Sequence, residues 1–362
     1  MKKLFKFGLM ILPLVSLTGC WRIGADKLTL DRFEYNSAVG DSWKEQMLLN
    51  LVKLRYGDVP VFLDVQGMIS QYTLQGTLGV NSNINSNSVT ATPWSWLAGI
   101  SGSTQYTDRP TITYAPLTGA KFGNSMMTPI PPSSIASLLQ SGFPAKMILR
   151  LSMNSINGLE NMFSIQAKGK VPNPDFFRLL DVTAELQKAN VFGMQQLKQP
   201  GKETEVTITL NKLDDENLKA KADEFRRLLG LEPDATQISV VYGVTPTKKN
   251  QIAMLTRSML DVLTDLSGYI EVPAKDVKEH KALPSQPAQQ SAGRSVPSLL
   301  RVHSEKGKSE DAFIAIDYRG QRFWVDNRDI DSKMTFSSLM LLFTLVESDD
   351  KSAAPKVVLP AG

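Results

Sequence analysis

The sequence predicts an α+β fold, in which a helical cluster with small mixed sheets is joined by two β-hairpins. Three observations predict it. A Gly-, Ser- and Asn-rich stretch at about residues 70–114 alternates with a period of two, which favours a β-hairpin. Residues 205–266 alternate between strand-like and helix-like apolar patterns, an order typical of a small α/β layer. Residues 299–347 hold a second hairpin and then a strongly apolar segment.

The N-terminus has the pattern of a secretion signal. Three lysines in the first six residues precede an apolar run at Leu9–Leu17, which is too short for a comfortable transmembrane helix. The run ends in Leu17-Thr18-Gly19-Cys20, which resembles the lipobox of bacterial lipoproteins. In that family the peptide is cut before the cysteine, which is then acylated. The resemblance therefore implies a signal peptide at residues 1–19, lipid attachment at Cys20 and a lipidated tether at residues 20–33.

The residue after this cysteine is Trp21 rather than aspartate, which in the sorting pattern of enteric lipoproteins favours the outer membrane. The folded part is then expected to face the periplasm, with membrane lipid as its partner through acylated Cys20. This is the only cysteine, so the chain cannot form an intrachain disulfide. Because the expected anchor uses its thiol, cysteine-based catalysis is excluded as well. Removing the three signal lysines from 40 basic residues leaves 37 against 36 acidic ones, which gives no electrostatic case for binding nucleic acid.

The first folded element is expected to be a helix at Glu34–Tyr56, followed by Gly57 as its stop. Ser42 and Glu45 have the spacing of a capping box, which would start the stronger part of the helix there. The apolar residues that share one face at helical spacing are Trp43, Met47, Leu48, Leu51 and Val52.

The stretch from Val65 to Thr107 has the most unusual amino-acid composition in the chain. It contains no charged residue, although 21% of the whole chain is charged. Leu74–Val80 and Ala98–Thr107 alternate with a period of two, and Asn81–Ser88 between them has turn chemistry. Pro93 interrupts the hairpin, and Asp108 and Arg109 are expected to restore charge at its foot.

An uncharged alternating hairpin with aromatic residues near its ends is what a lipid-facing β-hairpin requires, although a polar surface loop has a similar composition. One hairpin cannot close a barrel, so a membrane role would need several copies, each donating one hairpin. The candidate membrane-contacting residues are Tyr72, Leu74, Leu78, Val80, Trp94, Trp96, Ile100 and Tyr106.

The remaining elements follow from apolar spacing and from Gly and Pro punctuation. Helices are expected at 119–127, 135–140 (capped by Ser133 or Ser134), 145–156, 175–187, 214–229, 251–266 and 334–346. Strands are expected at 61–65, 109–114, 205–210, 237–242, 299–303, 312–318 and 321–325. The expected organisation is a main periplasmic domain at 34–272 that includes the hairpin, a linker at 273–298, a C-terminal hairpin and helix unit at 299–347, and a tail at 348–362.

The polar residues offer little chemistry. His280 and His303 are the only histidines, and no nucleophile motif or second metal ligand accompanies them, so we expect no catalytic residues, no metal site and no cofactor. Asp326–Asp331 lacks the glycine and final acid of a calcium loop, which favours turn and capping roles with Arg328 paired to an acid. Asp214–Glu216 sits at a predicted helix start, where acids favour the helix dipole.

Three functions compete on these grounds. The first is a membrane-anchored, non-enzymatic periplasmic lipoprotein with a binding or assembly role, through envelope protein partners or through a homo-oligomer. The second is an oligomeric β-barrel pore or secretion-associated lipoprotein that uses the hairpin at 65–107. The third is an envelope glycan hydrolase. The segments RYGDVPVFLDV, DRPTITYAPL and DYRGQRFWVDNRDID resemble those of a group of uncharacterised Gram-negative outer-membrane lipoproteins, a resemblance that implies no activity.

Overall fold

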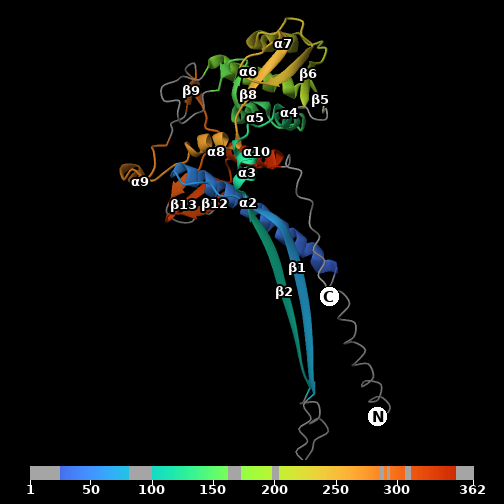
Figure 1. Ribbon diagram of the computed structural model, residues 1–362, viewed down its shortest axis with the longest axis vertical. Coiled ribbons are helices and arrows are strands. Elements are labelled where there is room, and N and C mark those ends of the chain that lie inside the picture. Colours follow the sequence, from blue (N-terminus) through green and yellow to red (C-terminus); the bar gives the residue numbers. More distant parts are fainter. Residues whose placement is uncertain are drawn as a thin grey trace, which may run out of the picture. The chain divides into compact units, whose positions relative to one another are not determined.

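The computed structural model describes residues 25–80, 100–161, 173–197, 204–285, 289–291, 294–305 and 311–347, and it has the predicted α+β fold (Figure 1). It contains two compact units. The first combines Met1–Pro60 with Gly119–Gly362, and the second is Val61–Thr118. The expected division was different, because the hairpin forms a unit of its own and the C-terminal hairpin and helix belong to the first unit.

The largest sheet of the first unit has six strands in the order β4-β3-β8-β7-β6-β5. All neighbours are antiparallel except β7 and β8, which are parallel. The strands are β3 (Met153–Ile156), β4 (Leu159–Glu160), β5 (Phe192–Leu197), β6 (Glu205–Leu210), β7 (Gln237–Tyr242) and β8 (Gln251–Thr256). The helices near this sheet are α4 (Pro132–Gln140), α5 (Ala145–Ser152), α6 (Pro174–Lys188) and α7 (Glu216–Leu229) (Figure 1).

A three-stranded sheet in the order β11-β13-β12 lies in the same unit, with α2 packed against β12 and α8. Its strands are β11 (His303–Glu305), β12 (Ala312–Tyr318) and β13 (Gln321–Asp326), and Arg319-Gly320 makes the predicted turn between the last two. The accompanying helices are α2 (Ala25–Arg55), α3 (Gly119–Phe122) with the π-helical turn η2 (Gly123–Met127), α8 (Met259–Ser267), α9 (Ala274–Lys278) and α10 (Ile330–Glu347).

Most helix positions were predicted, but several boundaries were wrong. Helix α2 begins at Ala25, so the tether expected at 20–33 is partly helical and Ser42 is not a helix start. Gly57 ends it with φ +74°, in the left-handed region that favours glycine. Proline, not Ser133 or Ser134, precedes and begins α4, because the fixed φ of proline suits the first helical position.

Two predicted helices are each partly strand. The expected helix at 145–156 divides into α5 and β3, and the one at 251–266 divides into β8 and α8. Strand β8 is buried along almost its whole length, so its apolar run has no alternation that distinguishes a strand from a helix. Similarly, the linker expected at 273–298 holds α9 and the short pair β9 (Gln289–Ser291) and β10 (Arg294–Val296), and the strand expected at 299–303 begins only at His303.

Candidate functional site

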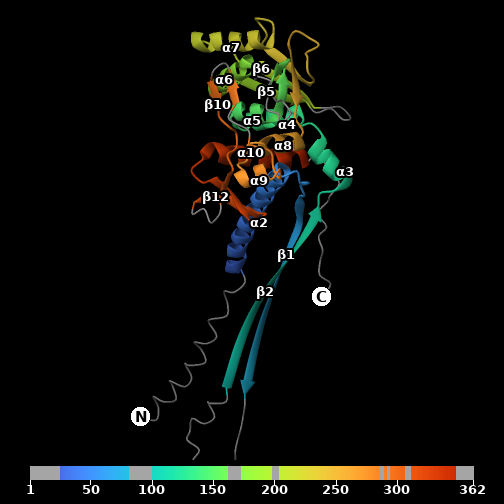
Figure 2. The same cartoon turned by 90° about the vertical axis from the view of Figure 1, so that its left-hand side faces the viewer.

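The structure contains the predicted hairpin, which is longer than expected. Strand β1 (Leu63–Val80) pairs antiparallel with β2 (Ile100–Pro116) from Leu63 opposite Pro116 to Val80 opposite Ile100. The two long, twisted strands lie side by side in both views (Figures 1 and 2). At a rise of about 3.4 Å per residue, the ribbon is about 55 Å long. The backbone amide of Leu117 donates to the carbonyl of Phe62 over 2.9 Å and continues the pairing at its base.

The register gives the β1–β2 ribbon one apolar face. Residues directly opposite one another lie on the same face, and successive residues alternate between faces. One face holds most of the large apolar positions, namely Leu63, Val65, Met68, Tyr72, Leu74, Leu78, Val80, Ile100, Tyr106, Ile112 and Tyr114. The other face is dominated by Thr, Gln and Ser, at Gln71, Thr73, Gln75, Thr77, Ser101, Ser103, Gln105, Thr107, Thr111 and Thr113.

A β-bulge at Gln66 maintains this separation. The register shifts by one residue between Val65, opposite Tyr114, and Gly67, opposite Thr113. A one-residue shift moves all later side-chain positions of a strand to the other face. Without the bulge, the apolar positions of β1 before and after Gln66 would lie on opposite faces. The side chains of Leu63, Ile112 and Tyr114 are exposed, so the described residues leave part of the apolar face uncovered.

The ribbon brings together most of the predicted membrane-contacting positions. Leu74 lies opposite Tyr106, Val80 opposite Ile100, and Tyr72 and Leu78 share their face. Trp94, Trp96, the turn at 81–88, Pro93 and Cys20 lie outside the described residues. One expectation was wrong: Asp108 and Arg109 are not at the foot of the hairpin, because pairing continues for seven further residues of β2 to Pro116.

The outer edges of the ribbon pair with no further strand among the described residues. Within the described part of the chain, the sheet contains only β1 and β2, so no third strand joins either edge. Isolated two-stranded hairpins are marginally stable in water, and a long open edge is a template for pairing with another chain. Pro110 of β2 has no backbone N–H to donate, and proline within a sheet is therefore found mainly in edge strands.

In the first unit, the chain just before the ribbon is held by an aromatic and charged cluster. The Tyr56 and Tyr318 rings lie 5.5 Å apart, and the Arg319 guanidinium lies 5.3 Å from each ring centroid. Arg319 and the hydroxyl of Tyr318 both donate to the Asp58 carboxylate. The Tyr56 hydroxyl donates to Asp276 over 2.6 Å, and burial, followed by this bond, raises the pKa of Tyr56. The cluster fixes the end of α2 against the β12–β13 turn.

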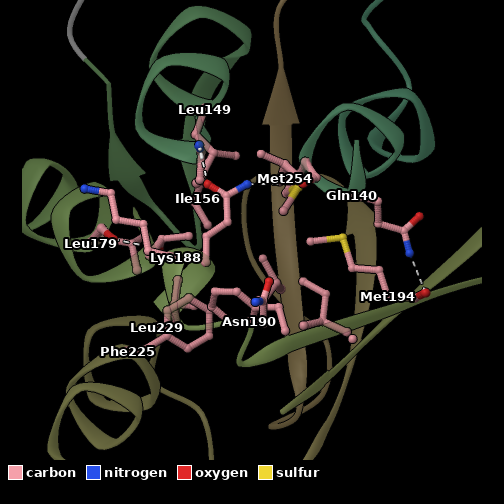
Figure 3. A pocket seen from close by; sticks show the side chains of 18 of the residues that line it. Gln140, Leu149, Ile156, Leu179, Lys188, Asn190, Met194, Phe225, Leu229 and Met254 are labelled. Carbon is pink, nitrogen blue, oxygen red and sulfur yellow. Dashed lines mark hydrogen bonds between the residues drawn. The ribbon is translucent and has the colours of Figure 1, made fainter. Parts of the chain in front are cut away.

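A cavity of about 600 Å³ is the second feature of the first unit (Figure 3). It lies among helices α4, α5, α6 and α7 and strands β3, β5, β6 and β8. Its buried wall is almost entirely apolar, with Ala145, Leu149, Ile156, Leu179, Thr183, Ile208, Phe225, Leu229, Ile252 and Met254. Its exposed rim is formed by Gln140, Gly142, Lys188 and Asn190. Sequence reasoning missed it, because no local pattern distinguishes a residue that lines a cavity from one packed in a core.

A carboxylate with a raised pKa, Asp265, is in a buried ion pair outside this cavity. Asp265 accepts a hydrogen bond from Arg257 over 2.9 Å, with 8% and 5% of their side chains exposed. Burial raises the pKa of Asp265 to about 6, although Arg257 opposes the shift. Arg257 also donates to the side chain of Asn154 and the carbonyl of Asn161. The arrangement joins α8 to the segment around β3 and is a structural interaction.

The acids and histidines mostly have the structural roles that the sequence predicted. Asp326 accepts from Arg328, and Asp329 accepts from the Ser332 amide at the start of α10. Asp215 caps α7 by accepting from two backbone amides. His303 lies 3.1 Å from Glu271 and stacks on Trp324 with ring centroids 4.8 Å apart. In the described residues, no cluster of three or more His, Cys, Asp or Glu side chains forms a metal site.

Comparison with known proteins adds no relationship: no family model, curated protein or solved structure matches the chain. Among the helices of the described residues, none has the length and apolar character needed to cross a bilayer.

Proposed function

We propose that this chain is a lipid-anchored envelope protein that assembles with copies of itself through the β1–β2 ribbon and forms an oligomeric membrane pore. The observation that carries the proposal is the ribbon itself: two long strands, one apolar face, one Thr-, Gln- and Ser-rich face, and two open edges. A pore strand requires this combination, with one face toward lipid and the other toward water. Edge pairing between copies would satisfy the backbone groups that lipid cannot.

The charge pattern supports insertion of the outer part of the ribbon. Thr73–Val80 and Ile100–Thr107 contribute eight uncharged residues each to paired strands, and residues 81–99 between them are also uncharged. A membrane strand needs about 9–11 residues, so each arm needs only a short extension from 81–99. Asp108 and Arg109 would then lie at the water boundary, and the remainder of the ribbon would form a stem outside the bilayer.

The expected lipid anchor at Cys20 supports the same proposal. A multiply acylated cysteine holds a protein stably at a membrane, whereas a single chain binds only marginally. Anchoring raises the local concentration of ribbons at the surface, which favours pairing between copies. The outer membrane is the proposed location.

A second candidate is an assembly role without a pore, in which an open edge of the ribbon pairs with a strand of another envelope protein. It is favoured by Asp108, which occupies a position on the otherwise apolar face, opposite Tyr72. A charge at this position suits a water-exposed ribbon that recognises its partner by strand addition. The hydrolase gains no support from the described residues, since Asp265, the carboxylate whose pKa burial raises, is paired with Arg257 and does not line the cavity.

The two candidates differ in oligomeric state and in membrane permeability. We expect the full-length lipidated protein to migrate as a discrete oligomer in mild detergent and to release a small dye from liposomes. A monomer that leaves the dye inside the liposomes would overturn the pore. An oligomer that releases no dye would contradict the pore and leave self-assembly in place, whereas the second candidate predicts a monomer that releases no dye.

A further inference from the structure

The cavity of the first unit has an apolar buried wall and a polar exposed rim. Ile156, Leu179 and Ile252 are at most 2% exposed and belong to its buried wall, whereas Lys188 and Asn190 at the rim are exposed. Figure 3 shows Leu149, Met254, Phe225 and Leu229 around the apolar interior, and Gln140 at one side. An apolar interior with a few polar groups at the opening is the usual arrangement of a small-molecule site.

The opening is fixed by hydrogen bonds within the protein. The Gln187 side chain accepts from the Ala145 amide over 2.8 Å and donates to the Leu139 and Phe143 carbonyls over 3.1 and 2.8 Å. The Gln140 side chain donates to the Met194 carbonyl over 2.6 Å and ties α4 to β5. These bonds fix the positions of the elements that form the opening.

The turn after α6 places two polar residues at the rim. Asn190 has φ +53°, and its carbonyl accepts from the Asn211 side chain over 3.1 Å. Lys188, the last residue of α6, has no carboxylate within ion-pair distance among the described residues. Protein interiors are normally close-packed, so a cavity of about 600 Å³ with an apolar wall is unusual inside a folded unit.

We propose that this cavity binds a single-chain anionic amphiphile, with the hydrocarbon chain against the apolar wall and the anionic head group at the rim, near Lys188. The hydrocarbon chain supplies most of the affinity, because each buried methylene group adds to the hydrophobic stabilisation. The lysine supplies the preference for an anion, and the side-chain amide of Asn190 is a hydrogen-bond donor for the same head group, since its backbone amide donates to the carbonyl of Gln187. The head group is a carboxylate or a phosphate, that is, a fatty acid or a lysophosphatidic acid. The proposal is independent of the pore.

The test is displacement of a fluorescent fatty acid, cis-parinaric acid, from the full chain. The chain carries Cys20→Ser to remove its own acyl group and is held in amphipol, since detergent would compete for the cavity. We expect palmitate or palmitoyl lysophosphatidic acid to displace the probe, and the stronger competitor identifies the head group. Hexadecanol, which is neutral, should compete at least about tenfold less well. Equal competition by hexadecanol, or no binding of the probe, would overturn the proposal.

Two pairs of variants locate the binding. Met254→Trp and Ile156→Trp fill the cavity, and either one that keeps the wild-type circular dichroism spectrum should lose at least about tenfold in probe affinity. Lys188→Glu should weaken palmitate binding by about tenfold, whereas Lys212→Glu, an exposed lysine that does not line the cavity, should leave it unchanged. The proposal fails if a folded filled variant binds like the wild type, or if the two lysine variants behave alike.

Discussion

Tyr72 of β1 lies opposite Asp108 of β2, and between this pair and the tip of the hairpin neither strand carries a charge. The pair divides the ribbon into a stem with charged residues and an uncharged arm of eight paired positions per strand. At about 3.4 Å per residue, the arm measures about 27 Å along its strands, which a tilt of about 40° reduces to about 20 Å across the bilayer. A short extension of each strand would therefore be needed to reach the apolar band of about 25 Å in outer-membrane barrels. Tyr72 and Tyr106 occupy positions near the boundary, where membrane barrels carry aromatic girdles.

A lysine on one face of the arm should have a different effect from a lysine on the other. Leu78→Lys places a charge on the apolar face, at a cost of about 2–4 kcal/mol per subunit near the bilayer midplane, so it should abolish dye release. Thr77→Lys is the matched control on the polar face and should retain dye release. Comparable loss of release in both variants would remove the assignment of faces.

Arg319 has the left-handed backbone conformation that favours glycine, although its side chain makes contacts that glycine cannot make. Its φ is +50°, while its guanidinium contacts the rings of both Tyr56 and Tyr318. Arg319→Ala loses the cation–π contacts and keeps the strained backbone, so it should cost about 1–3 kcal/mol in the free energy of unfolding. Arg319→Gly relieves the backbone and should cost about 1 kcal/mol less than Arg319→Ala. Urea unfolding of the full chain measures both, and a glycine variant less stable than the alanine variant would contradict this explanation.

Asp329 should make stability depend on pH in the acid range. Hydrogen bonds from Arg301, and then from Ser332, lower the pKa of Asp329 in the folded state. A lowered folded pKa gives stability that is present above the unfolded pKa of about 4 and is lost as the pH falls through the folded value. Asp329→Ala should therefore cost about 1–3 kcal/mol at pH 7, and the difference should shrink below about pH 4. A difference that stays constant down to pH 2 would show that charge is not the cause.

The Arg257–Asp265 pair should show the opposite pH dependence. Burial raises the pKa of Asp265 to about 6, above its unfolded value. This group therefore stabilises the fold most below its unfolded pKa of about 4, and that contribution is lost as the pH rises through about 6. Relative to Asp265→Asn, the wild type should become more stable as the pH falls from 7 to 5, as thermal unfolding would show. A constant difference across that range would contradict the raised pKa.

Removing one partner of this pair tests its packing role. Arg257→Met leaves Asp265 buried without its cation and should cost about 3–5 kcal/mol at pH 7. Adding Asp265→Leu should restore part of that stability, because two apolar side chains replace two buried charges. Chemical unfolding of both variants measures the difference, and a double variant less stable than Arg257→Met would exclude this explanation.

The sequence predicted features that depend on local patterns. Alternation identified the β1–β2 hairpin, and Gly57 and Gly230 ended their helices as expected, because these signals are contained in a few neighbouring residues. Strand β8 was predicted as part of a helix, since a strand that is buried on both faces shows no alternation of apolar and polar residues. The bulge at Gln66 was not foreseen, because it depends on pairing with β2. The cavity was not foreseen because it arises from four helices and four strands packed together.

The most direct test of the ribbon proposal is a cysteine scan across β1 from Thr73 to Val80 in the full chain, labelled with an environment-sensitive dye in liposomes. Cys20 is the only native cysteine and its expected acylation leaves each introduced thiol as the single labelling site. The proposal predicts a period of two: Leu74, Leu78 and Val80 quenched by a lipid-embedded quencher, and Thr73, Gln75 and Thr77 quenched by aqueous iodide. Uniform quenching by iodide at all these positions would show that the arm remains in water, and it would contradict the proposal.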